Sequence, residues 1–174
     1  KKELISLRRR KHKGYANRGK QLELIIDKQN KLYINRNIAY VRKVPTNVRI
    51  LGTNSRGQVR GNLMRGYFCD YVGVYKGRML EFDAKQTNGK SLSFDNVRAN
   101  QELALETVHK MGGYAFLIVH FKELNRYFRL AWSDYSHIKS NTERKSLSLQ
   151  HFEEYAHEIE EGKNGILNYL GGLK

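Results

Sequence analysis

Cysteine is almost absent from this chain of 174 residues, which contains only Cys69. A single cysteine cannot form an internal disulfide, and it cannot by itself build a cysteine-based zinc site. The six histidines are scattered, without a pair at the spacing of metal ligands. Apolar runs are also short: the longest, 115–119, falls far below the roughly eighteen residues that span a bilayer. These absences exclude a disulfide scaffold, a cysteine zinc site and a membrane span.

Acidic residues are scarce in the N-terminal half. Residues 28–69 contain nine Lys or Arg and no acid, and residues 1–20 contain nine more with only Glu3, whereas five acids gather at 153–161. The whole chain carries 32 Lys and Arg against 17 Asp and Glu, a formal net charge of +15. Such a charge attracts polyanions. Nucleic acid is therefore the first expected partner, and anionic membranes or acidic proteins are weaker alternatives.

The pattern of apolar residues predicts an α/β fold, with a mixed central sheet flanked by helices. The whole chain, 1–174, is expected to form one domain. Its dense positive charge predicts that 1–15 is a flexible basic arm, and the Gly- and Arg-rich stretch 52–66 is predicted to be a projecting basic loop or hairpin. Helices are predicted at 17–33, 95–111, 133–137, 148–155 and 166–170, and strands at 38–43, 48–51, 70–75, 78–85, 114–121 and 127–132.

The candidate chemistry lies on the predicted hairpin 70–85. A two-residue turn would place Asp70 directly opposite Asp83, provided that no bulge intervenes. Opposed carboxylates repel each other, but a hard divalent cation that prefers oxygen ligands makes such a pair favourable. Lys85 follows Asp83 by two positions, so it lies on the same face and can stabilise the attacking hydroxide or the charge on a phosphate. These residues predict metal-dependent phosphodiester hydrolysis.

Other interpretations of these residues stay open. Asp83 could instead form an exposed cross-strand ion pair with Lys85 or Arg78, because a bare Asp-x-Lys pattern is common by chance. A non-catalytic nucleic-acid-binding protein would explain the net charge without explaining the opposed aspartates. A nuclease that acts on ordinary duplex DNA would explain both.

Three further side chains are candidates for the same site. Glu23 lies on the first predicted helix, where it could lean toward the metal or pair with a neighbouring lysine such as Lys20. Glu81 shares a face with Asp83 but lies farther into the strand, so it ranks second. Gln101 lies on the next predicted helix, where its amide could hold the nucleophilic water.

The core motif, Asp70 followed by Asp83–Ala84–Lys85, resembles that of the PD-(D/E)xK nuclease superfamily. More specifically, the chain resembles the RecU family of Holliday junction resolvases over roughly residues 15–170. The matching segments are Asn17–Arg18–Gly19 followed by Glu23, Lys43–Val44–Pro45–Thr46, Asp70–Tyr71 with Gly73–Val74–Tyr75–Lys76–Gly77–Arg78, Phe82–Asp83–Ala84–Lys85, Asn100–Gln101 and Arg144–Lys145–Ser146.

The resemblance implies a restriction-endonuclease-like fold, a homodimer and dependence on Mg²⁺, for which Mn²⁺ would substitute. It implies symmetric nicking of four-way DNA junctions during recombination and repair, with branched DNA and recombination proteins as partners. It places the enzyme in the bacterial cytoplasm at the nucleoid; no secretory signal is expected, because the basic N-terminus is not followed by an apolar segment. Asp70, Asp83 and Gln101 would lie at the metal, Lys85 would be catalytic, and Glu23 would complete the acidic set.

The same resemblance assigns the DNA contacts. Segment 52–66, with Arg56, Arg60 and Arg65, would be the stalk that enters the junction centre. Further expected contacts to phosphate are Arg18, Lys76 and Arg144. One departure concerns the site itself, because relatives usually carry Glu where this chain has Asp83, which is shorter by one methylene.

Overall fold

The structure is a computed structural model that describes residues 20–64, 68–163 and 165–173. The predicted arm at 1–15 lies outside these residues. Within the described part, no helix is both long and apolar enough to cross a membrane.

A six-stranded mixed sheet forms the centre of the molecule. Strands β5 and β7 run parallel, and each of the other neighbouring pairs is antiparallel. This arrangement confirms the predicted α/β class and mixed central sheet. In spatial order the strands are β1 (Ala39–Lys43), β4 (Tyr71–Tyr75), β5 (Arg78–Thr87), β7 (Tyr114–Phe121), β8 (Arg126–Ala131) and β10 (His157–Ile159).

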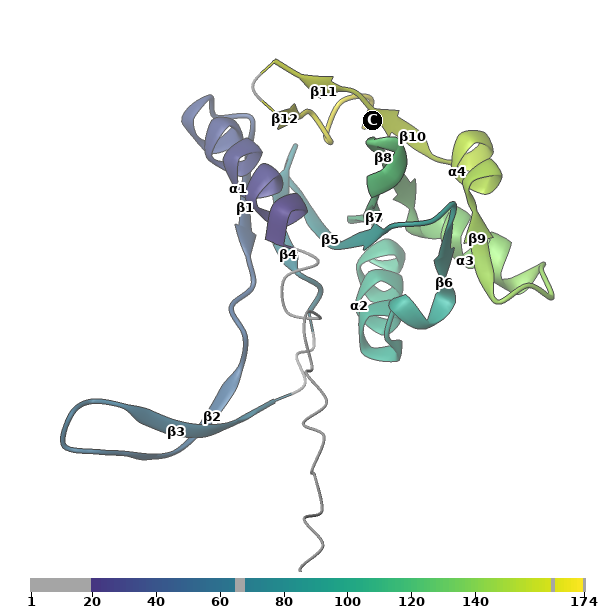
Figure 1. Cartoon of the computed structure of the whole chain (residues 1–174). Coiled ribbons are helices and arrows are strands. Elements are labelled where there is room, and N and C mark those ends of the chain that lie inside the picture. Colours follow the sequence, from purple (N-terminus) through teal and green to yellow (C-terminus); the bar gives the residue numbers. More distant parts are fainter. Residues whose placement is uncertain (1–19, 65–67, 164, 174) are drawn as a thin grey trace, which may run out of the picture.

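Helices cover both faces of this sheet (Figure 1). One face packs against α1 (Lys20–Asn35), whose Leu22 and Ile26 share a core cluster with Phe82. The other face packs against the second group of helices, and there Leu105 and Leu117 share a separate core cluster. Every residue of β7 is buried, as expected for a central strand covered on both sides. The second group comprises α2 (Ala99–Lys110), α3 (Trp132–Ser140) and α4 (Leu149–Tyr155).

A β-hairpin projects away from the sheet (Figure 1). It consists of β2 (Val48–Thr53) and β3 (Val59–Leu63), and all residues of both strands are exposed. The turn is closed by Asn54, whose side-chain oxygen accepts the backbone N–H groups of Arg56 and Gln58, each at 3.0 Å. The prediction of a projecting basic loop or hairpin is confirmed for the described part of 52–66.

Two predicted helices differ from the structure. The helix predicted from residue 95 begins later than expected. Residues Phe94–Asn96 form a 3-10 turn, η1, and α2 begins at Ala99. The helix predicted at 166–170 is wrong: β12 (Ile166–Leu167) pairs with β11 (Glu161–Gly162), and turns follow. The segment is not helical because of a contact with a distant strand. Arg129 donates to the carbonyl oxygens of Tyr169 and Gly171 at 2.6 Å each, and these bonds hold the segment in turns. No local pattern predicted η2 (Lys122–Leu124) or the three-residue strands β6 (Ser91–Ser93) and β9 (Ser146–Ser148).

Candidate active site

The candidate site lies where β4 separates from β5. The two strands pair in the predicted register up to Tyr71–Phe82, without a bulge, and Asp70 and Asp83 are the next residues outward on the two chain segments. Because β4 begins at Tyr71, the backbone of β5 has no β4 ladder partner beyond this point. The carboxylate of Asp70 fills that place: its Oδ2 accepts the backbone N–H of Ala84 at 3.2 Å. The end of the hairpin therefore holds Asp70 next to the residue that follows Asp83.

Asp83 is completely buried, with 0% of its surface exposed. Lys85 Nζ lies 2.5 Å from its Oδ2, and Gln101 Nε2 donates to its Oδ1 at 2.5 Å. Burial raises the pKa of Asp83 above the ordinary value, the Lys85 ammonium lowers it, and repulsion from Asp70 raises it further. That the two carboxylates share one metal ion stays a prediction.

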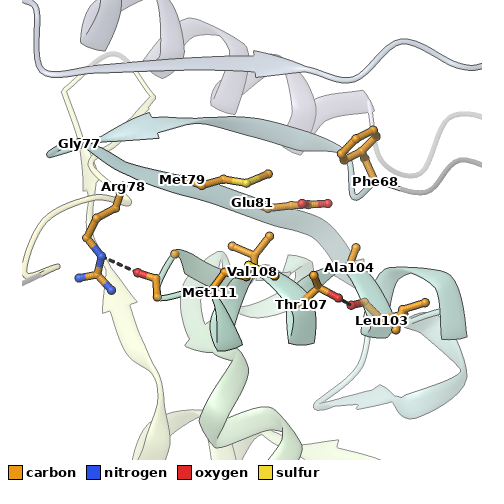
Figure 2. Close-up of a pocket in the computed structure, with 12 residues that line it drawn as sticks. Phe68, Gly77, Arg78, Met79, Glu81, Leu103, Ala104, Thr107, Val108 and Met111 are labelled. Carbon is orange, nitrogen blue, oxygen red and sulfur yellow. Dashed lines mark hydrogen bonds between the residues drawn. The ribbon is translucent and has the colours of Figure 1, made fainter.

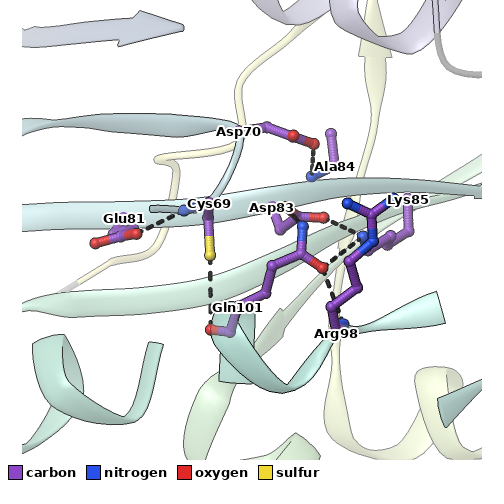
Figure 3. A network of polar contacts seen from close by, with 8 residues as sticks. All are labelled: Cys69, Asp70, Glu81, Asp83, Ala84, Lys85, Arg98 and Gln101. Atoms are coloured by element: carbon purple, nitrogen blue, oxygen red, sulfur yellow. Dashed lines mark hydrogen bonds and ion pairs between the residues drawn. The ribbon is translucent and has the colours of Figure 1, made fainter. Parts of the chain in front are cut away.

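Gln101 links Asp83 to Lys85 (Figure 3). It lies in the first turn of α2, and its Oε1 accepts the backbone N–H of Arg98 at 3.0 Å and the ammonium of Lys85 at 3.1 Å. Since both donors face Oε1, the amide nitrogen faces Asp83. Lys85 keeps 16% of its side chain exposed, so its ammonium lies at the edge of the site. The predicted Asp83–Lys85 ion pair therefore exists, but it is built into a buried network.

The chemistry of these donors fits a hard divalent cation. Carboxylate oxygens are the ligands that Mg²⁺ and Mn²⁺ prefer, and Oδ2 of Asp83 is buried without an aligned hydrogen bond from the described residues. Within that part of the chain, no three His, Cys, Asp or Glu side chains gather into a ready-made metal cluster. The protein itself thus offers the carboxylates of Asp70 and Asp83, a pattern typical of Mg²⁺ sites that are completed by water and substrate phosphate.

The structure places Glu23 at α1, where it binds Lys43 Nζ at 2.7 Å. Its backbone oxygen accepts the Tyr71 hydroxyl at 3.3 Å, which fixes this turn of α1 beside the start of β4. Glu23 is thus near the hairpin end, but no contact joins its carboxylate to Asp70 or Asp83 in the described structure. Its role as a third acid stays a prediction.

The predicted DNA contacts are spread over the molecule. Arg56 and Arg60 lie on the exposed β2–β3 hairpin. Lys76 lies at the opposite end of β4 from Asp70, where it donates to the carbonyl oxygen of Leu173 at 3.1 Å. Arg144 is exposed just before β9. Two further predicted contacts, Arg18 and Arg65, lie outside the described residues.

With this geometry established, comparison with known proteins decides the family. The sequence profile described as recombination protein U (RecU) matches residues 17–174. This chain belongs to the RecU family. A RecU protein from Pediococcus pentosaceus, named Holliday junction resolvase, is 32% identical over 165 residues, covering 90% of this chain and 82% of that protein. Its namesake from Lactobacillus helveticus is 33% identical over 167 residues, covering 92% and 80%.

Among solved structures, the Holliday junction resolvase Hjc of Archaeoglobus fulgidus aligns with a TM-score of 0.48 and 10% identity, over 78% of this chain and 90% of that chain. The RecU match confirms the resemblance seen in the sequence motifs. Family membership does not decide the roles of individual side chains in this RecU chain, which depend on the geometry of the site.

Proposed function

We propose that this protein is a Holliday junction resolvase, an endonuclease that makes symmetric nicks in four-way DNA junctions by metal-dependent hydrolysis during recombination and repair. The observation that carries the proposal is the buried network of Asp83, Lys85 and Gln101 beside Asp70. A protein that only binds DNA gains nothing from two interacting carboxylates, because they repel phosphate and one of them is costly to bury. A nuclease uses both as metal ligands.

In this proposal, Asp70 and Asp83 hold Mg²⁺, or Mn²⁺ in its place. The bound cation supplies Lewis-acid stabilisation of the charge on the scissile phosphate. Lys85 presents its ammonium on the same face, where it orients the attacking water and stabilises the negative charge that develops on phosphate. Gln101 holds Asp83 and Lys85 in their relative positions through one amide group.

Gln101 and Glu23 have weaker support as metal ligands. The Gln101 oxygen already accepts two hydrogen bonds, so we assign this residue a positioning role, and its predicted place among the ligands stays a prediction. Glu23 is engaged by Lys43 and is proposed only as a third acid that completes the set.

Symmetric nicking requires two equivalent sites, and an isologous homodimer supplies them on a substrate that is itself two-fold symmetric. We therefore propose a homodimer whose β2–β3 hairpins, with Arg56 and Arg60, enter the junction centre. Arg144 and Lys76 are proposed to contact phosphate outside the centre. Recombination proteins as partners and a cytoplasmic site of action at the nucleoid are proposed on family grounds alone.

The test is to compare a synthetic four-way junction with linear duplexes of the same sequence, each labelled on one strand at a time, in Mg²⁺. The proposal predicts paired nicks at symmetric positions in opposed strands and products that DNA ligase seals. Equal cleavage of the linear duplexes would identify a general duplex nuclease instead. Binding without cleavage of any DNA would support the non-catalytic alternative.

A further inference from the structure

A second buried carboxylate, Glu81, lies two residues before Asp83 and on the same face of β5. Only 1% of its surface is exposed, and its Oε1 accepts the backbone N–H of Cys69 at 2.7 Å. Burial raises the pKa of Glu81, and the hydrogen bond from Cys69 opposes that shift. Burying a carboxylate costs free energy compared with burying an apolar side chain of similar size. The contact of Glu81 with Cys69 therefore suggests a functional role.

That contact replaces a missing part of the sheet. Residues 69 and 70 precede β4, so the β4–β5 ladder does not hold them. Side chains hold them instead: Glu81 binds the N–H of Cys69, and Asp70 binds the N–H of Ala84. The carbonyl oxygen of Asp70 is held from the other side by the N–H of Val44 at 2.8 Å. Glu81 therefore fixes the backbone on the N-terminal side of Asp70.

Glu81 binds the backbone of Cys69 and not a side chain of the Asp83 network. It lines an apolar groove of about 590 Å³ between β5 and α2, and Figure 2 shows its side chain extending from β5 toward the segment that carries Phe68. In Figure 3, Cys69 separates Glu81 from Asp83. The thiol of Cys69 also donates to the backbone oxygen of Gln101 at 3.7 Å, which ties the same segment to α2.

We propose that Glu81 is a positioning residue that sets the place of the Asp70 carboxylate by holding the N–H of Cys69. The inference rests on the proposed function, because it takes Asp70 as a metal ligand. Glu81 acts through its reach and its acceptor oxygen, and its charge is not required. This separates a positioning residue from a metal ligand, for which the negative charge is essential.

Two conservative variants separate reach from charge. Glu81→Asp keeps the charge but shortens the side chain by one methylene, so the bond to Cys69 is broken. Glu81→Gln keeps an acceptor oxygen at the same reach without the charge. Glu106→Asp is the matched control, because Glu106 is an acid on α2 that accepts a side-chain hydrogen bond, from Trp132 at 2.5 Å. For each full-length protein, Mn²⁺ affinity is measured by calorimetry, and the melting temperature and the Mg²⁺ dependence of junction nicking are recorded.

We expect Glu81→Asp to weaken Mn²⁺ binding about 10- to 100-fold, the effect of removing a residue that orients a metal ligand in other proteins. The Mg²⁺ concentration needed for nicking should rise. Glu81→Gln should stay close to the wild type, and Glu106→Asp should leave Mn²⁺ binding unchanged. The inference is overturned if Glu81→Gln is the more damaging variant, which would make Glu81 a ligand. It is equally overturned if both variants only lower the melting temperature. A wild type that binds Mn²⁺ without nicking junctions would defeat the proposed function but not this inference.

Discussion

Asp83 is an acid in surroundings that disfavour its charge. It is fully buried next to Asp70, and two side chains compensate: the ammonium of Lys85 and the amide nitrogen of Gln101. Each of these partners also contacts the other, so the loss of one changes the position of the rest. Sequence reasoning named all four side chains as candidates, but not that the amide of Gln101 joins Asp83 to Lys85.

Replacing Lys85 with Met removes the ammonium and keeps the length of the side chain. We expect single-turnover junction nicking to fall about 100- to 1,000-fold, the size of effect seen when a preorganised charge-stabilising donor is removed. Junction binding, measured by gel shift in Ca²⁺, should change little, because the basic surface is intact. Loss of binding in parallel with nicking would show that Lys85 acts in DNA capture rather than in the reaction.

The raised pKa of Asp83 has a consequence for stability in metal-free buffer. A carboxyl whose pKa is higher in the folded state takes up a proton on folding, so its contribution to stability increases as the pH falls through that raised pKa toward the ordinary aspartate value. Chemical denaturation should therefore show the wild type gaining stability relative to Asp83→Asn between about pH 8 and about pH 5. A stability difference that is independent of pH would contradict the buried, raised state of Asp83.

The β4–β5 hairpin was predictable because the turn residues and the alternation of side chains along the two strands indicate the same pairing. Lys76 and Gly77 have φ values of 50° and 74°, as a two-residue hairpin turn requires, and this turn fixes the register that brings Asp70 to Asp83. The buried strand β7 was equally clear from its continuous apolar run. Local patterns were therefore sufficient to predict the central part of the sheet and the catalytic candidates.

Contacts between distant segments were not predictable in the same way. The bond from the Ala84 amide to Asp70 exists because the β4–β5 ladder stops at Tyr71, which no local pattern reveals. The position of Gln101 depends on α2 beginning at Ala99, whereas the sequence suggested a start at Asp95. The C-terminal turns form around Arg129, which lies 40 positions before the Tyr169 carbonyl oxygen that it binds.

The β2–β3 hairpin exposes every residue of its two strands, so packing does not explain its arginines, and we propose that they contact DNA. The double variant Arg56→Ala/Arg60→Ala should weaken junction binding more than binding to linear duplex. The log–log salt slope of binding should become shallower by about 0.9 for each phosphate that the protein no longer neutralises. Lys110→Ala, an exposed position on α2, serves as the control. Equal weakening on junction and duplex would argue against entry into the junction centre.

The pairing of β1 with β4 depends on a glycine. A Cβ added at Gly73 would lie 2.1 Å from the backbone oxygen of Tyr40, so Gly73→Ala must push the two strands apart. We expect the free energy of unfolding to fall by about 1–3 kcal/mol, as in other overpacked sites. Gly89→Ala, where an added Cβ meets nothing within 4 Å, is the matched control and should leave urea denaturation unchanged.

The distribution of charge over the whole molecule agrees with a DNA-processing role. The N-terminal half carries the basic excess, whereas five acids lie at 153–161, where Arg126 binds Glu153 and Glu158 at 2.5 and 2.7 Å. Arg126 thus partly neutralises two of these five acids at the surface, whereas the basic excess stays available to a polyanion.

Metal-dependent nicking through Asp83 can be tested on a synthetic four-way junction with the wild type and with Asp83→Asn, each in Mg²⁺ and in a chelator. We predict paired symmetric nicks only for the wild type in Mg²⁺, while Asp83→Asn binds the junction and leaves it intact. Nicking by Asp83→Asn at the wild-type rate, or an intact junction with the wild type in Mg²⁺, would contradict this mechanism.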